Sequence, residues 1–232
     1  LLDRDAQGAE KVAAELRAAG AQAMAVGCDV SSETDVQEAA ARVLAELGPC
    51  RALINNAGML RPGRLEDVSL ADWNALLSVN LTGYLLCARA FAQQMRTAGG
   101  GSIVNVASIA GHFPQTASGA YSASKAGVLL MSRQMAVEWG AYGIRSNAIC
   151  PGMIRTPLSA KFYEEPGFEA KRAAVTASGR IGEPQDIANA AIFLASPRSS
   201  YVNAAEIMVD GGMSSMLMDM VPRPGFNNGA RV

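Results

Sequence analysis

The sequence predicts an α/β fold in which a doubly wound parallel sheet lies between two layers of helices. Short apolar runs of about four to six residues alternate with amphipathic segments of helical period, which is the pattern of βαβ units. The right-handed crossovers of such units wind helices onto both faces of one sheet. The length of 232 residues is the default size of a single domain with a substantial core. We therefore expect one three-layer α/β/α domain.

The apolar runs place the strands. Ser102–Ala107 is the clearest, because four of its six residues are apolar and it is short enough for a buried strand. Leu1 and Leu2, followed by Asp3, have the pattern of the end of a strand. The predicted strands lie at residues 1–3, 21–26, 52–54, 102–107, 145–149 and 206–209.

Helical period and capping residues place the helices between these strands. Ser31 or Ser32 caps the second helix, and Ser69 with Asp72 forms a capping box for the third. Glu183, followed by proline, begins the last helix. The predicted helices cover residues 6–19, 32–47, 69–96, 121–142 and 183–194.

Two stretches fall outside this alternation. Residues 157–178 are polar and interrupted by prolines, which predicts a mobile excursion. Residues 213–232 are first rich in methionine and then in proline and glycine, with no clear period. We expect the domain to cover residues 1–212 and residues 213–232 to form a tail. The tail would be a subunit contact, a flap over a substrate site or a loosely attached end.

Composition and charge limit the classes of function. The formal net charge is −1 and there is no long basic run, so nothing indicates a nucleic acid or an anionic membrane as a partner. No apolar run approaches the roughly 18 residues of a membrane helix. The 4 cysteines are scattered through apolar segments, which predicts reduced, buried thiols in a cytoplasmic protein. A single histidine, His112, predicts no zinc or iron site.

The pair Tyr121 and Lys125 is the first candidate for catalysis. In a helix, residues four apart stand on one face, one turn from each other. An ammonium beside a phenol favours the phenolate, so we expect the pKa of Tyr121 to fall and the phenol to act as a general acid and base. Ser108 follows the strand at residues 102–107, and ligands of open parallel sheets lie beyond the carboxyl ends of strands. The alternative is a solvated helix face, since a lone Tyr-x-x-x-Lys pair is common.

Further motifs accompany this pair along the chain. In order, they are Asn55-Asn56-Ala57-Gly58, Asn80, Ser108, Tyr121-x-x-x-Lys125 and Pro151-Gly152-x-x-x-Thr156. With these motifs in this order, the chain resembles the short-chain dehydrogenase/reductase family from Leu1 to about Gly212. It is similar to the single-domain members, such as oxoacyl-carrier-protein reductases and sugar or polyol dehydrogenases.

The resemblance implies a Rossmann-like NAD(P)-binding domain at residues 1–212 and a small alcohol or ketone as substrate. It also implies a cytoplasmic homo-oligomer, either a dimer or a tetramer. The helices at residues 69–96 and 121–142 would form its main contact.

The resemblance implies four catalytic residues. Tyr121 would be the general acid and base, and Lys125 would bind the nicotinamide ribose and lower the tyrosine pKa. Ser108 would orient and polarise the substrate carbonyl. Asn80 would hold a water that links Lys125 to bulk solvent; the alternative is that Asn80 merely caps or kinks its helix.

The resemblance also implies a cofactor site along the strand ends. Asp29 would accept the adenine amino group and Val30 would supply a backbone contact, while the small residues after Asn56 would let the backbone approach the ribose. The backbone at Ile154 would hold the carboxamide. The implied cofactor-binding residues are Asp3, Asp29, Val30, Asn56, Ala57, Gly58, Tyr121, Lys125, Pro151, Gly152, Ile154 and Thr156.

Asp3 favours NAD over NADP. A carboxylate at the end of the second strand of such a unit accepts hydrogen bonds from the ribose hydroxyls and repels a 2′-phosphate. Two alternatives remain: Asp3 or Asp5 caps the following helix, or Arg4 pairs with a phosphate.

The sequence departs from the family at its start. Family members begin with a strand, a glycine-rich turn and a helix, about 30 residues that are missing here. We expect these 232 residues to be part of a longer polypeptide, because the neighbours of a lost central strand would leave unpaired backbone and an open core. A chain that began at Leu1 would bind no dinucleotide.

The predicted function is reversible hydride transfer between NAD, or NADP, and a secondary alcohol or ketone. One alternative is an epimerase or dehydratase of the family, and another is a non-catalytic scaffold subunit, which would not need all four catalytic residues. Apolar and aromatic residues would shape the substrate pocket: His112, Phe113, Met153, Leu158, Phe162, Tyr163 and Phe168.

Overall fold

The strands form two parallel sheets in the computed structural model, which describes residues 1–157 and 159–225 but not the side chains of residues 161 and 162. The strands are β1 (Leu2–Asp3), β2 (Val26–Gly27), β3 (Ala52–Asn55), β4 (Gly101–Val106), β5 (Ile144–Pro151) and β6 (Glu206–Val209). β1 pairs with β2, and the other four pair in the order β3-β4-β5-β6. The prediction of a parallel α/β fold is confirmed.

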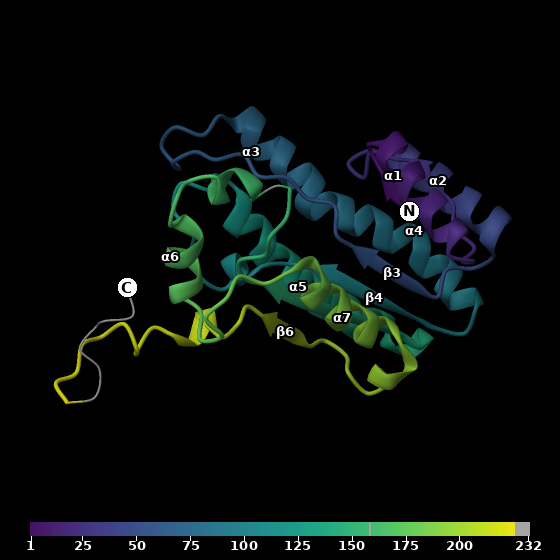
Figure 1. The fold of residues 1–232 in the computed structure, drawn as a ribbon. Coiled ribbons are helices and arrows are strands. Elements are labelled where there is room, and N and C mark those ends of the chain that lie inside the picture. Colours follow the sequence, from purple (N-terminus) through teal and green to yellow (C-terminus); the bar gives the residue numbers. More distant parts are fainter. Residues whose placement is uncertain (158, 226–232) are drawn as a thin grey trace.

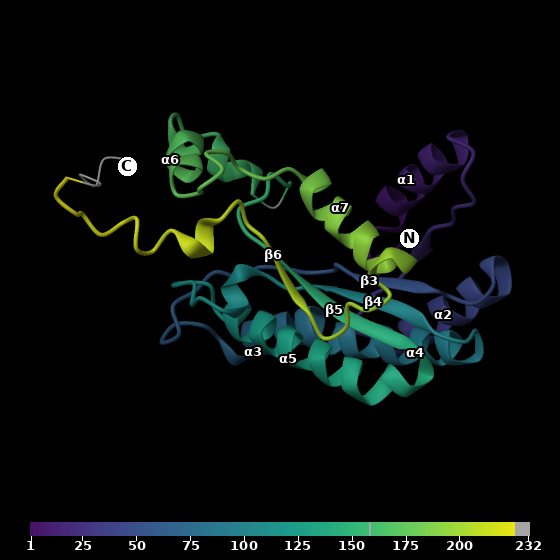
Figure 2. The same ribbon diagram turned by 90° about the horizontal axis from the view of Figure 1, so that it is seen from below.

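Helices cover both faces of the strands (Figures 1 and 2). In Figure 2, α1 and α7 lie on one face and α2, α4 and α5 on the other. The α-helices are α1 (Ala6–Ala18), α2 (Glu33–Leu47), α3 (Leu70–Leu77), α4 (Gly83–Thr97), α5 (Tyr121–Trp139), α6 (Phe168–Ala174) and α7 (Pro184–Ala195). Short 3-10 turns are η2 (Ile109–Gly111), η3 (Gly140–Tyr142), η4 (Ala160–Tyr163), η5 (Pro197–Ser199) and η6 (Met213–Ser215).

The two sheets are not paired with each other in the described residues. A cavity lined by residues of both β1 and β3 lies between them. β2 is shorter than predicted. The strand was expected over residues 21–26, but only Val26 and Gly27 pair with β1.

The core holds the two sheets together through their helices. Val26 of β2, Phe91 of α4 and Ile103 of β4 belong to one buried cluster, which α2 and α5 complete. Val104, the next residue of β4, points the other way and packs with Leu194 of α7. This alternation is the period of a strand that is buried on both faces.

The helix predicted over residues 69–96 is interrupted at its centre. A π-turn, η1 (Ser78–Thr82), separates α3 from α4, and the backbone N–H of Gly83 donates to the carbonyl of Ser78 five residues back. Single π-turns of this kind are frequent at functional sites. The turn carries Asn80, so the disturbance inferred from this residue is present.

One segment differs from the sequence expectation about membranes. Leu70–Thr97 is long and apolar enough to cross a membrane by length and composition, and 44% of its apolar window is buried in the protein. Tyr84, Phe91 and Met95 of this segment are at most 3% exposed and pack in the protein core. The segment therefore has the packing of a core helix.

The helix starts were predicted well, while the excursion contains a helix that was not predicted. Ser32 and Ser69 accept hydrogen bonds from the backbone of the first helical turn, as expected of caps. Glu183 begins α7 with a capping box. The excursion at residues 157–178, for which no helix was predicted, contains η4 and α6. Arg155 forms ion pairs with Glu169 of α6 and with Glu183 at the start of α7.

Candidate active site

The four candidate catalytic residues come from three elements that meet beyond β4. Tyr121 is the first residue of α5, and Lys125 follows one turn later on the same face. The Lys125 Nζ lies 5.8 Å from the centroid of the Tyr121 ring. Ser108 lies two residues after β4, and Asn80 lies in the π-turn η1.

Ser108 is held rigidly between the strand and the turn that follows. Its backbone is extended, and its Oγ accepts a hydrogen bond of 3.1 Å from the backbone N–H of Ala110, so that it caps η2. The side chain is buried, and its hydrogen bonding with the Tyr121 phenol favours the phenolate, which opposes the effect of burial on the pKa of that phenol. The Ser108 hydroxyl and the Tyr121 phenol therefore lie next to each other.

The pKa of Tyr121 departs from the sequence prediction. Burial raises the pKa of this phenol above its usual value of 10.0, and hydrogen bonding with Ser108 offsets only part of the rise. The prediction of a lowered pKa is wrong for this structure, because desolvation outweighs the hydrogen bonding that favours the phenolate. Tyr121 is therefore a protonated phenol at neutral pH, ready to donate.

Lys125 is buried and bound to groups that the sequence did not indicate. Its Nζ donates to the carbonyl oxygen of Val106 at 2.8 Å and to the hydroxyl of Tyr84 at 3.4 Å. Burial lowers the pKa of Lys125 from 10.5 to about 8. The ammonium therefore loses its proton at a lower pH than an exposed lysine does.

Asn80 anchors the segment that follows β3. Its Oδ1 accepts from the backbone N–H of Met59 at 2.9 Å, and its Nδ2 donates to the carbonyl of Met59 at 3.0 Å. A more distant bond of 3.5 Å joins Nδ2 to Ser124 on α5. The expected role of Asn80 in holding a water remains a prediction, and its side-chain amide already connects η1 to the strand end.

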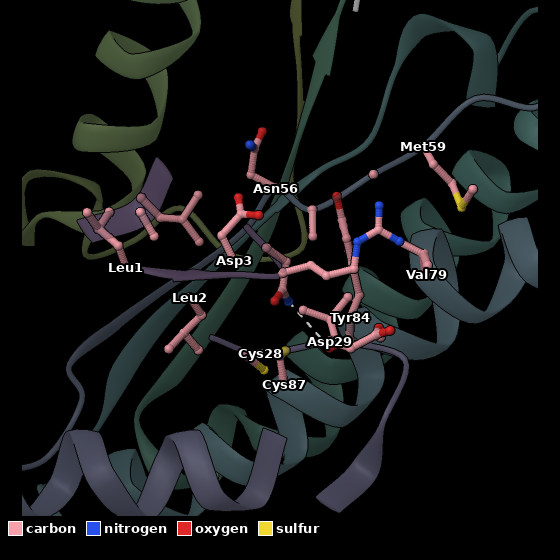
Figure 3. A pocket seen from close by; sticks show the side chains of 18 of the residues that line it. Leu1, Leu2, Asp3, Cys28, Asp29, Asn56, Met59, Val79, Tyr84 and Cys87 are labelled. Atoms are coloured by element: carbon pink, nitrogen blue, oxygen red, sulfur yellow. Dashed lines mark hydrogen bonds between the residues drawn. The ribbon is translucent and has the colours of Figure 1, made fainter. Parts of the chain in front are cut away.

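A cavity of about 560 Å³ opens at the carboxyl ends of β1, β2 and β3. Its size falls in the usual range for small-molecule sites, about 300–1,000 Å³. Figure 3 shows Asp3, Asp29 and Asn56 around it. The structure brings together here half of the candidate cofactor-binding residues, namely Asp3, Asp29, Val30, Asn56, Ala57 and Gly58.

Gly58 connects this cavity to the catalytic residues. A Cβ at this position would lie 3.7 Å from Asn80 Oδ1 and 4.0 Å from Lys125 Nζ. Gly83 is more crowded, because a Cβ there would lie 2.8 Å from the Val30 side chain. The crowding at Gly83 explains why the backbone itself forms the cavity wall there.

Asp29 and Asp3 give this cavity acidic groups. Asp29 Oδ1 accepts from both the hydroxyl and the backbone N–H of Ser31, and these hydrogen bonds, with a smaller effect of Arg4, hold the pKa of Asp29 below its usual value. Asp3 Oδ1 accepts from the backbone N–H of Asp5, whose own side chain caps α1. Of the two alternatives for capping, Asp5 is therefore the cap.

Of the remaining cofactor candidates, Tyr121 and Lys125 lie on α5, and the other four lie at or after the end of β5, outside the lining of this cavity. A Cβ at Gly152 would lie 2.7 Å from the Asp210 Cβ, so the chain turns closely against β6 there. Ile154 forms a bridge with Gly182 and lines a second cavity of about 200 Å³. The Thr156 hydroxyl and backbone N–H both bond to Ser159.

The candidates for a substrate pocket are only partly described. The His112 Nε2 lies 2.9 Å from Glu206 Oε2, so this histidine is engaged at the sheet edge. Phe113 is half exposed. Leu158 and the Phe162 side chain lie outside the described residues.

Sequence reasoning missed the residues that hold Lys125 and Asn80. Tyr84, Val106 and Met59 supply the hydrogen-bond partners, and none of them belongs to a recognisable motif. The one available signal was that Tyr84 follows Asn80 by four residues, the spacing of one helix face.

Comparisons with known proteins agree with this geometry. A family model described as enoyl-(acyl carrier protein) reductase matches residues 1–214. D-threitol dehydrogenase from Mycolicibacterium smegmatis is 40% identical over 211 residues, which are 91% of this chain and 81% of that enzyme.

The fold is also similar to the solved structures of two dehydrogenases, over most of both chains. A gluconate 5-dehydrogenase from Burkholderia cenocepacia, in complex with NADP and tartrate, has a TM-score of 0.88 and 33% identity, with 93% of this chain and 84% of that chain covered. A 7α-hydroxysteroid dehydrogenase, in complex with NADH and 7-oxo glycochenodeoxycholic acid, has a TM-score of 0.87 and 34% identity, with 91% and 82% covered.

Proposed function

Because the chain belongs to the short-chain dehydrogenase/reductase family, and so interconverts secondary alcohols and ketones with a nicotinamide cofactor, we propose that Tyr121 is its general acid and base. The observation that carries this proposal is the meeting of the Tyr121 phenol with the Ser108 hydroxyl, one helical turn from the Lys125 ammonium.

The bound nicotinamide supplies a hydride in ketone reduction and accepts one in alcohol oxidation. In reduction, the Tyr121 hydroxyl gives its proton to the carbonyl oxygen while a new C–H bond forms at the carbonyl carbon. The Ser108 hydroxyl donates to the same oxygen as negative charge develops on it, a contribution of about 3–4 kcal/mol for a preorganised donor. In oxidation, the Tyr121 phenolate takes the hydroxyl proton.

Lys125 and Asn80 would support this proton transfer. The Lys125 ammonium favours the phenolate of Tyr121 in the step where that residue carries charge. Asn80 holds Met59, and with it the end of β3, close to Lys125. The cofactor would extend from the cavity of Asp3, Asp29, Val30, Asn56, Ala57 and Gly58 toward Pro151, Gly152, Ile154 and Thr156.

Replacing Tyr121 by phenylalanine tests the proposal. We expect Tyr121→Phe to lose nearly all turnover and to retain cofactor affinity, because the ring stays and only the hydroxyl is lost. Turnover would be followed by nicotinamide absorbance and affinity by calorimetry. Turnover within tenfold of the unmodified enzyme would refute the assignment.

NAD is the preferred cofactor in this proposal. The Asp3 carboxylate lines the cavity at the end of β1, where negative charge would repel a 2′-phosphate. We expect Asp3→Ser to lower the ratio of kcat/KM with NAD to that with NADP by about tenfold or more. An unchanged ratio would contradict the role of Asp3 and favour the alternative in which Arg4 pairs with a phosphate.

The substrate is proposed to be a small secondary alcohol or its ketone. Relatives whose names specify polyols and hydroxysteroids define the panel to screen, with NAD and NADP in parallel. Oxidation should be faster at alkaline pH, because the raised pKa of Tyr121 leaves little phenolate at neutral pH.

We further propose that residues 1–212 act as one cofactor-binding domain within a homodimer or homotetramer. Leu130 and Val137 on α5 are 62% and 80% exposed, as apolar side chains of an interface would be in a single copy. In Figures 1 and 2 the described part of the tail runs away from the sheet, so residues 213–232 would be a second contact or a flap. Light scattering would give the number of subunits.

A cytoplasmic location is proposed from the cysteines. Cys28, Cys50, Cys87 and Cys150 are all free thiols, which suits a reducing compartment. Fractionation of cells with an antibody against the chain would test this location.

A further inference from the structure

The hydroxyl of Tyr84 lies in hydrogen-bonding range of the Lys125 ammonium. Tyr84 is 1% exposed on α4, and its Oη donates to the carbonyl oxygen of Val106 at 3.0 Å. Lys125 Nζ donates to the same carbonyl at 2.8 Å and to the Tyr84 oxygen at 3.4 Å. The three groups form a closed triangle at the end of β4.

The chemistry of a phenol suits this position. Because the Tyr84 proton goes to Val106, its oxygen lone pairs are left to accept from the ammonium. Burial raises the pKa of Tyr84 above its ordinary value, so the group is a neutral phenol at neutral pH. The ammonium also lies 5.2 Å from the Tyr84 ring centroid, closer than to the Tyr121 ring.

Tyr84 is itself fixed from several sides. The Asn55 side chain donates to the Tyr84 carbonyl at 3.4 Å, and Gly83 brings the start of α4 against Val30. The titratable groups that face Nζ are Tyr84 from α4, Tyr121 from α5 and Cys150 from β5. The Tyr84 phenol is therefore a rigid, neutral hydrogen-bond partner for the ammonium. It lies on α4, which directly follows the π-turn η1.

We propose that Tyr84 is a positioning residue whose hydroxyl holds the Lys125 ammonium in place for the proton transfer at Tyr121. This inference rests on the proposed function, in which Lys125 supports Tyr121. It adds to the four motif residues a fifth that acts through Lys125 and does not touch the substrate.

The test compares Tyr84→Phe with Tyr201→Phe, which removes a hydroxyl from a fully exposed tyrosine. The first measurement is an NMR titration of the Lys125 Nζ in cofactor-free protein labelled with ¹⁵N-lysine. Lysine occurs at residues 11, 125, 161 and 171, and a Lys125→Met sample assigns the signal. The second is the pH profile of kcat/KM, and the third is the melting temperature.

We expect Tyr84→Phe to lower the pKa of Lys125 by about one unit, since a hydrogen bond to a charged group is lost. The alkaline limb of kcat/KM should move down by a similar amount, while Tyr201→Phe changes neither. A lower melting temperature with an unchanged Nζ titration would make Tyr84 merely structural and overturn the inference. If the Nζ titration moves and the alkaline limb does not, the contact stands and the proposed role of Lys125 in turnover fails.

Discussion

We expect the buried, charged side chain of Lys125 to destabilise the folded protein. Its side chain is 4% exposed, and burial lowers its pKa from 10.5 to about 8. A difference of about 2.5 between the two values, at about 1.36 kcal/mol per pKa unit, corresponds to a cost of about 3 kcal/mol for the charged form. We therefore expect Lys125→Met, which keeps an apolar stem of similar length, to raise the free energy of unfolding at pH 7 by about 2–3 kcal/mol.

The destabilisation caused by Lys125 should decrease as the pH rises. The unfolded chain holds the lysine proton more tightly than the folded protein does, so the cost is complete below pH 8 and disappears as the pH rises from 8 to 10.5. The difference between Lys125→Met and the unmodified protein should shrink over that interval.

Urea unfolding at a series of pH values measures this difference, with Lys11→Met as the control because Lys11 is exposed on α1. The Lys125→Met variant should also lose most of its turnover, as expected of a residue that trades stability for function. A variant less stable than the unmodified protein at pH 7 would refute the reasoning.

Two further predictions concern packing around the site. Gly152→Ala should destabilise the protein by about 1–3 kcal/mol, because its Cβ would lie 2.8 Å from the backbone Cα of Asp210. Gly63→Ala is the control, since its nearest neighbour would lie at 3.6 Å, and equal melting temperatures for the two variants would contradict the prediction. Asn80→Ala should weaken cofactor binding and lower the melting temperature, because both backbone groups of Met59 lose their partner. Unchanged affinity measured by calorimetry would show that Asn80 does not shape the site.

The local signals in the sequence predicted most of the elements. Ser32, Ser69 and Glu183 mark helix starts that the structure confirms, because capping depends on a few neighbouring residues. The apolar run at residues 102–107 likewise gave β4 to within one residue at either end. Such features depend on local chain geometry alone.

The properties that depend on tertiary packing were not predictable in this way. The spacing of Tyr121 and Lys125 placed both on one face correctly, but the direction of the tyrosine pKa depends on burial, which spacing does not reveal. The partnership of Tyr84 with Lys125 joins residues 41 positions apart. Helix α6 was missed because the prolines around it dominated the local pattern.

The most direct test of the account is a crystal structure with a nicotinamide cofactor and an unreactive ketone or alcohol bound. We expect one substrate oxygen within about 2.6–3.2 Å of both the Tyr121 hydroxyl and the Ser108 Oγ. A substrate oxygen bound elsewhere, with the nicotinamide ring away from these two groups, would contradict it.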